Sequence, residues 1–188
     1  MKKKGKLVVL SGPSGVGKDT VANEYIKNNN AIISVSATTR KIRNGEVDGI
    51  NYYFLNENEF KNWIEKDNFL EYAMYNNCYY GTPKSKIEEN LNNGIDVFLV
   101  IEVKGGLQIK EKVKESILIF LLPPDMDELK RRLSNRNTDT KEMIDNRMKI
   151  AEEEIKASEK YDYRIINNDI KTTVKQIENI IKSEKLKD

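Results

Sequence analysis

The chain of 188 residues contains no histidine, and this absence removes several kinds of active site. Histidine is the commonest general base of enzymes, the base of serine triads and a frequent zinc ligand. A reaction that needs such a base is therefore disfavoured. A reaction whose attacking group is already negatively charged is favoured, because it needs positioning and charge neutralisation rather than proton removal.

Cysteine and long apolar segments are also scarce. Cys78 is the only cysteine, so no intramolecular disulfide can form, and we interpret this residue as a packing residue in a protein of a reducing compartment. The first apolar run stops at Ser11, which argues against a signal peptide, and no segment is long enough to span a bilayer. These features predict a cytoplasmic protein without a membrane partner.

Neither sign of charge dominates the composition. The 32 lysine and arginine residues nearly balance 30 aspartate and glutamate residues, and the net charge of +2 gives no strong field that would attract nucleic acid. The length fits one domain with small insertions. A hydrophobic fraction of 38% can supply its core, and the oligomeric state is open between a monomer and a homodimer.

The most informative stretch is residues 7–20, LVVLSGPSGVGKDT. An apolar run typical of a strand leads into a glycine-rich loop, which is followed by a lysine and a predicted helix over residues 20–28. Glycines let backbone N–H groups approach an anion, and a helix N-terminus adds positive potential. This context predicts a loop that binds nucleotide phosphates through Gly12, Pro13, Ser14, Gly15, Val16, Gly17, Lys18, Asp19 and Thr20.

Asp19 stands where this kind of loop usually has a serine or threonine that helps to hold Mg²⁺. A carboxylate is a good Mg²⁺ ligand, although it places negative charge beside the phosphates unless the metal lies between them. The alternative is an ordinary first-turn acid, which the helix dipole favours. The sequence leaves both interpretations open.

Short apolar segments alternate with amphipathic helical patterns along the chain, which predicts an α/β fold with about five parallel core strands. The expected strands are residues 7–10, 32–35, 95–101, 116–122 and 163–166. Two excursions interrupt this core: a small mixed-β insertion over residues 36–82 and a lid over residues 125–150. The core itself comprises residues 1–35, 83–124 and 151–188. Thr82 and Pro83 suit the N-cap and first turn of a helix running to about residue 92.

Further charged residues are candidates for the site. Arg40 and Arg43, beside hydroxyl groups, form a possible anion clamp or a basic surface loop. Glu102 comes at the end of a predicted buried strand. Its side chain either faces a ligand or a metal ion, or makes a local hydrogen bond. Arginines on both sides of a polar loop, Arg132, Arg136 and Arg147, suit a lid that closes on charge, or an ordinary solvated helix pair.

The chain resembles the guanylate kinase family over nearly its full length. The resemblance is carried by GPSGVGK, by FLEYA, by YYGTP, by IINND and, most specifically, by SVSATTRKIRNGEVDGINYYF. It implies a P-loop kinase that transfers the γ-phosphoryl group of ATP to GMP, and to dGMP, with Mg²⁺. Such a transfer onto a phosphate oxygen needs no histidine.

The resemblance also implies roles for individual residues. The GMP phosphate would be held by Arg40, Arg43, Tyr52 and Tyr80, and guanine would be read by Ser36, Glu71, Thr82 and Glu102. The transferring phosphoryl group would be neutralised by Lys18, Arg43, Arg132, Arg136 and Arg147, while Asn167 would lie near adenine.

The chain departs from the family pattern at three places. Asp19 replaces the usual serine, Val100-Ile101-Glu102 replaces a pair of aspartates around isoleucine, and Asn135-Arg136-Asn137 replaces Gly-Arg-Gly. We hypothesise that Asp19 partly replaces the acid missing at Val100, near Mg²⁺. Two alternatives stay open: a related kinase of a small molecule such as ribose 1,5-bisphosphate, and a non-catalytic module that binds a protein.

Overall fold

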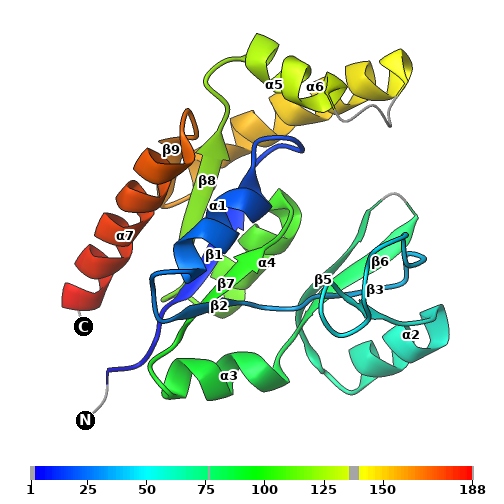
Figure 1. The fold of residues 1–188 in the computed structure, drawn as a ribbon. Helices are drawn as coiled ribbons and strands as arrows, with labels where there is room; N and C mark the ends of the chain where they lie inside the picture. The colour runs from blue at the N-terminus through cyan, green and yellow to red at the C-terminus, as the bar shows by residue number, and fades with distance from the viewer. Residues whose placement is uncertain (1–2, 76, 136–139, 188) are drawn as a thin grey trace.

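The computed structural model describes residues 3–75, 77–135 and 140–187. The described chain forms a five-stranded core sheet and a separate four-stranded sheet beside it (Figure 1). The core strands are all parallel, in the order β2 (Ala31–Ile33), β7 (Asp96–Val100), β1 (Leu7–Ser11), β8 (Ile117–Leu122) and β9 (Tyr163–Ile166). This arrangement confirms the predicted α/β fold.

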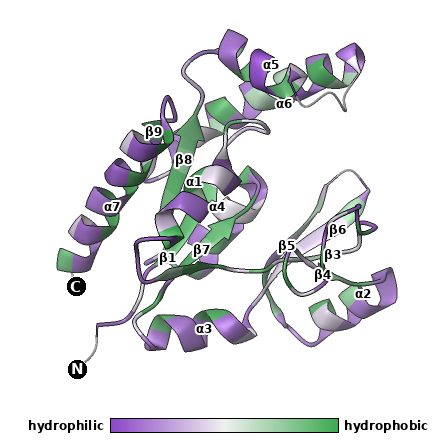
Figure 2. Ribbon diagram, in the orientation of Figure 1, coloured by the Kyte–Doolittle hydropathy of each residue, from purple (hydrophilic) through white to green (hydrophobic). Residues whose placement is uncertain are grey.

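Helices cover both faces of the core sheet because β1 alternates its apolar side chains between them. Val8 and Leu10 pack with helices α1 (Lys18–Ile26) and α7 (Ile170–Leu186). Leu7 and Val9 pack on the other face with α3 (Ser85–Asn92) and α4 (Val103–Lys112). A strand buried on both faces has no polar side, which explains its continuous apolar run. Figure 2 shows the core strands as hydrophobic and the helices as two-sided.

The second sheet lies within the predicted insertion and has its own apolar core. Its order is β4 (Tyr53–Phe54), β3 (Ala37–Thr38), β6 (Cys78–Pro83) and β5 (Phe69–Tyr75), with parallel and antiparallel pairs, and it is flanked by α2 (Glu57–Glu65). Phe60 of α2 stacks on Phe69 at 4.4 Å between ring centroids. Trp63 and Tyr79 pack around this pair.

Two helices, α5 (Met126–Ser134) and α6 (Lys141–Ala157), occupy the predicted lid and pack through Leu129, Leu133 and Ala151. The Asp125 side chain accepts from the Glu128 backbone N–H at 2.7 Å, as the sequence pattern predicts for the start of α5. Figure 1 shows both helices at the edge where the loop after β1 emerges. A 3₁₀ turn (Ser158–Lys160) follows α6. In the described residues, no helix has the length and apolar character of a membrane span.

The prediction that Thr82 and Pro83 start a helix is wrong. Both residues belong to β6, and α3 begins at Ser85 after Lys84 as N-cap, which makes no side-chain capping bond. Thr82 pairs with Glu71 of β5 across the sheet. This long-range strand pairing overrides a local capping preference, and the backbone that would start the helix is used by the sheet instead.

Candidate active site

The loop between β1 and α1 has the backbone that phosphate binding requires. Gly12, Gly15 and Gly17 have positive φ angles of 150°, 87° and 100°. A Cβ at Gly12 would lie 2.5 Å from the Leu121 carbonyl oxygen, so a side chain is excluded there by geometry as well as by conformation. Lys18, the first residue of α1, donates to the carbonyls of Gly12 at 2.5 Å and Pro13 at 3.3 Å.

A buried amide supports this loop from behind. The Asn167 side chain, 4% exposed, donates to the Val16 carbonyl at 2.8 Å and accepts from the Thr173 hydroxyl at 2.9 Å. A Cβ at Gly17 would lie 2.9 Å from the Asn167 amide nitrogen, so the glycine also makes room for this contact. Asn167, predicted near adenine, therefore lies directly under the phosphate loop, at the end of β9.

Two of the three lid arginines reach the same loop. Arg147 of α6 donates to the Ser14 hydroxyl at 3.1 Å. Arg132 of α5 donates to the Val16 and Asn167 carbonyls, both at 3.3 Å, and its Nε donates to Glu128 at 2.7 Å. Arg136 lies outside the described residues. Two arginines, one from α5 and one from α6, thus bring positive charge to the phosphate loop, although both helices are distant from that loop in the sequence.

A second cluster of positive and aromatic groups forms on the small sheet. The Arg40 guanidinium lies 5.4 Å from the Tyr52 ring centroid, and Tyr52 contacts Tyr80 edge-on at 6.1 Å. Glu46 holds Arg40 with two charged hydrogen bonds of 2.7 and 3.0 Å and accepts from the Arg43 backbone N–H at 2.8 Å. The Arg40 hydrogen bonds lower the pKa of Glu46. Glu46 was not predicted as a site residue. Its position between Asn44-Gly45 and Asp48-Gly49, close to both arginines in the sequence, could have identified it as their partner.

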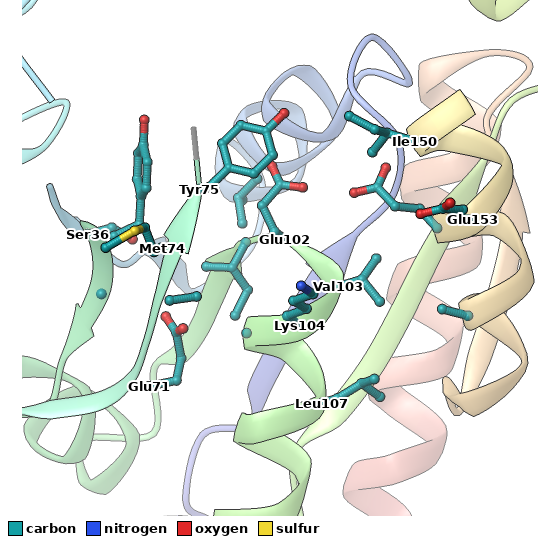
Figure 3. Close-up of a pocket in the computed structure, with 18 of the residues that line it drawn as sticks. Ser36, Glu71, Met74, Tyr75, Glu102, Val103, Lys104, Leu107, Ile150 and Glu153 are labelled. Atoms are coloured by element: carbon teal, nitrogen blue, oxygen red, sulfur yellow. The ribbon is translucent and has the colours of Figure 1, made fainter. Parts of the chain in front are cut away.

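A cavity of about 550 Å³ opens between the two sheets. Figure 3 shows Glu71 on one side, Ile150 and Glu153 of α6 on the other, and Glu102 and Lys104 between them. Five predicted residues line it, namely Ser36, Tyr52, Glu71, Tyr80 and Glu102. Thr82 does not line the cavity; it stands behind Glu71.

Glu71 is a buried carboxyl aimed at this cavity. It is 4% exposed, and the Thr82 hydroxyl donates to it at 2.6 Å. Burial raises the pKa of Glu71, while the Thr82 hydrogen bond acts in the opposite direction. A Cβ at Gly105 of α4 would lie 2.8 Å from the Glu71 carboxylate, so a glycine at this position permits the close approach of α4 to Glu71. The carboxylate keeps acceptor capacity for a ligand with two adjacent donors.

Two further acids belong to this part of the molecule, Asp19 at the start of α1 and Glu154 on α6. Asp19, in the first turn of α1, is exposed. Burial raises the pKa of the Tyr52 hydroxyl, and the charge of Asp19 raises it further. Glu154 of α6 also lines the cavity. No sequence signal identified Glu154, because it lies in a run of three glutamates on an amphipathic helix.

Comparison with known proteins agrees with this geometry. A family model described as guanylate kinase matches residues 4–184. A guanylate kinase of Clostridioides difficile is 53% identical over 98% of this chain and 91% of its own length. One of Clostridium tetani is 50% identical over 97% and 88%, respectively. A crystal structure of guanylate kinase from Anaplasma phagocytophilum superposes with a TM-score of 0.82 at 37% identity, covering 98% of this chain and 88% of that one.

These relatives match the chain nearly end to end, and the match includes the small sheet as well as the phosphate loop. The resemblance inferred from the sequence motifs is confirmed. Because the family model spans the core, the insertion and the lid together, the chain belongs to the guanylate kinase family.

Proposed function

We propose that the protein transfers the γ-phosphoryl group of ATP to GMP, and also to dGMP, giving ADP and the nucleoside diphosphate. The observation that carries this proposal is the buried Glu71 carboxyl at the cavity between the sheets, held by Thr82 at 2.6 Å. Guanine offers N1–H and N2–H₂ as adjacent donors to one carboxylate. Adenine would present an acceptor at N1 and be repelled.

The acceptor site extends from the base to the phosphate on the small sheet. Ser36, Thr82 and Glu102 complete the reading of guanine around Glu71. Arg40 and Arg43 bind the GMP phosphate, since guanidinium groups grip phosphate in a fixed geometry, and the hydroxyls of Tyr52 and Tyr80 donate to it. Glu46 keeps Arg40 oriented before GMP arrives.

The donor site uses the loop from Gly12 to Thr20. Its backbone N–H groups hold the ATP phosphates, and Lys18 turns from the loop carbonyls toward the outer phosphates. Arg132, Arg136 and Arg147 of the lid, together with Lys18 and Arg43, neutralise the charge on the phosphoryl group in transfer. The segments 36–82 and 125–150 close on the core and exclude water, which would otherwise accept the phosphoryl group. Asn167 positions the loop beside the adenosine.

Mg²⁺ accompanies ATP in this proposal. When bound, it would supply charge neutralisation to the phosphates in the transition state. Mg²⁺ usually takes one or two protein carboxylates and fills its shell with phosphate oxygens and waters, so one exposed acid beside the loop fits it. Asp19 is such an acid. No group of three or more acidic, cysteine or histidine side chains forms a metal cluster in the described parts of the chain.

The test is an ADP-release assay with ATP and Mg²⁺ against GMP, dGMP, AMP, UMP and ribose 1,5-bisphosphate. We expect turnover confined to GMP and dGMP. Glu71→Gln should lower kcat/KM for GMP about 10- to 100-fold, because a charged hydrogen bond worth about 1.5–3 kcal/mol is lost. Glu65→Gln, an exposed acid of the same insertion, is the matched control.

Two results would contradict the proposal. Turnover of ribose 1,5-bisphosphate alone would keep the phosphate loop and replace the acceptor. GMP binding without turnover of any acceptor would favour the non-catalytic module.

A further inference from the structure

Two buried hydroxyl groups flank the backbone of Glu102, the residue between β7 and α4. Ser11, the last residue of β1, is fully buried, and its Oγ donates to the Ile101 carbonyl at 2.8 Å. Tyr161, which is 7% exposed, donates to the Val103 carbonyl at 3.4 Å. The carbonyls of the residues before and after Glu102 are thus each bonded by a side chain from another part of the chain.

The Ser11 bond lies where the backbone pairing of β1 and β7 ends. The last pair of the parallel register joins Leu10 to Val100, and the backbone of Ser11 pairs with β8. The Ser11 hydroxyl therefore adds one bond toward the β7 side past the last backbone pair, at the residue before Glu102. Because Gly12 follows Ser11, the same short segment also begins the phosphate loop.

Gly106 of α4 makes room for both hydroxyl groups. A Cβ at Gly106 would collide with the Tyr161 hydroxyl oxygen and lie 3.3 Å from the Ser11 Oγ. The Gly106 backbone N–H donates to the Glu102 carbonyl at 3.0 Å, the bond that an N-cap residue accepts at the start of its helix. The Tyr161 ring packs edge-on against Phe120 at 5.3 Å between ring centroids. The two hydroxyl groups therefore pack directly against the first turn of α4.

Glu102 needs this support through its backbone because its side chain does not cap α4. The residue is exposed, lines the cavity and makes no side-chain capping bond. Figure 3 shows Glu102 in the space between Glu71 and the α6 residues. A carboxylate reads a base only if its backbone holds it to within about 0.5 Å of the productive position.

The 2-amino group of guanine has two hydrogens and can use two acceptors. One hydrogen lies beside N1–H and suits the Glu71 carboxylate, whereas the other points away from N1 and is left for a second acceptor. Glu102 is the second carboxylate among the residues proposed to read guanine, and it comes from the core-sheet side of the cavity. Hypoxanthine, the base of inosine monophosphate (IMP), keeps N1–H and O6 but lacks the 2-amino group.

We propose that Ser11 is a positioning residue for guanine specificity: its hydroxyl, together with that of Tyr161, fixes the backbone at Glu102 so that the Glu102 carboxylate accepts from the 2-amino group. This inference rests on the proposed function, because it assumes GMP as the acceptor. Ser11 and Tyr161 bond the backbone on either side of Glu102 and act only through it. The residue that precedes the donor loop thereby helps to select the acceptor base.

The experiment measures the Kd of GMP and, in competition with GMP, the Kd of IMP by calorimetry for the wild type, Ser11→Ala and Ser116→Ala. Loss of one hydrogen bond should weaken GMP binding roughly 2- to 12-fold in Ser11→Ala. IMP binding should change much less, so the ratio of the IMP Kd to the GMP Kd should fall by that factor. Damage to the phosphate loop or to the fold weakens both ligands alike and cancels in this ratio.

Ser116→Ala is the matched control. Ser116 is 1% exposed and donates to the Val113 carbonyl at 2.7 Å, so it resembles Ser11 in burial and in the kind of bond. It precedes the amino end of β8, whereas Ser11 lies at the carboxyl end of β1. The Kd ratio of Ser116→Ala should therefore equal that of the wild type.

Two further variants test the route of the effect. Tyr161→Phe keeps the ring packing, removes the hydroxyl and should lower the Kd ratio in the same direction, which keeps the test decisive should Ser11→Ala fail to fold. Glu102→Ala should lower the ratio at least as much as Ser11→Ala. Adding Ser11→Ala to Glu102→Ala should leave the ratio where Glu102→Ala alone puts it.

The inference alone would be overturned by a wild-type Kd ratio in Ser11→Ala or Glu102→Ala, or by a further fall of the ratio in the double variant. With Ser11→Ala unfolded, a wild-type ratio in Tyr161→Phe would overturn it. Failure of the wild type to bind GMP would overturn the proposed function and this role of Ser11 with it.

Discussion

Acidic residues show how strongly the surroundings decide what one side chain does. Glu46 is held by two hydrogen bonds from Arg40, whereas Glu71 is buried against Thr82. The first is suited to orient a cation, and the second to accept hydrogen bonds from a base.

Asp19, in the first turn of α1, is an exposed acid whose role in metal binding can be tested. Asp19→Ala should raise the Mg²⁺ concentration needed for half-maximal activity roughly tenfold or more, as loss of a metal-orienting group commonly does. The KM for GMP should change by less than about twofold, because the proposed GMP contacts do not include Asp19. Mg²⁺ titrations of initial rate at saturating ATP and GMP measure the effect, and Asp19→Asn, which keeps an oxygen ligand, should give an intermediate value. Equal losses in Mg²⁺ dependence and GMP affinity would refute the metal role.

At this scale the sequence predicts residues that belong to a contiguous motif and misses those that pair across the chain. Tyr52, Glu71, Tyr80 and Ser36, which the motifs point to, all line one cavity. Glu154 lines the same cavity from α6, and no local pattern distinguishes it from its neighbours Glu152 and Glu153.

Secondary-structure elements were predictable where one periodicity dominates. The strand β9 begins and ends at the predicted residues, because its short run of β-forming residues marks it clearly. Thr82 was misread because it has a local interpretation at a helix start. The actual constraint is its pairing with Glu71, which lies on another strand.

Asn167, which follows β9, supports the phosphate loop through its bond to the Val16 carbonyl. Its substitution can distinguish this support of the loop from recognition of the adenine base. Asn167→Ala removes the 2.8 Å amide bond to the Val16 carbonyl and leaves that carbonyl the longer Arg132 bond of 3.3 Å, so one hydrogen bond worth about 0.5–1.5 kcal/mol is lost. We therefore expect a roughly 2- to 12-fold weaker affinity for ATP and an equal loss for inorganic tripolyphosphate, measured by competition binding. The exposed Asn168→Ala is the matched control. A loss restricted to ATP would instead assign Asn167 to adenine.

The described residues form two sheets with separate apolar cores and a cavity between them. Of the two acids proposed to read guanine, Glu71 lies on β5 of the small sheet and Glu102 follows β7 of the core sheet. GMP would therefore contact both sheets, and its binding should draw the two sheets together. Composition and length predict one domain with insertions, but only the folded chain shows which residues face each other across the cavity.

The only tryptophan of the chain, Trp63, lies in the small core with Phe69 and Tyr53. Its emission spectrum therefore reports on that core, whereas far-ultraviolet circular dichroism averages over every helix and strand. In a urea titration we expect the fluorescence midpoint below the dichroism midpoint, because the smaller core buries less apolar surface. Saturating GMP should bring the two curves together, and coincident curves without GMP would show a single cooperative unit. Trp63 is thus an intrinsic fluorescent probe of the small sheet, where GMP is proposed to bind. Closure of this sheet around a nucleotide can be followed without attaching a dye.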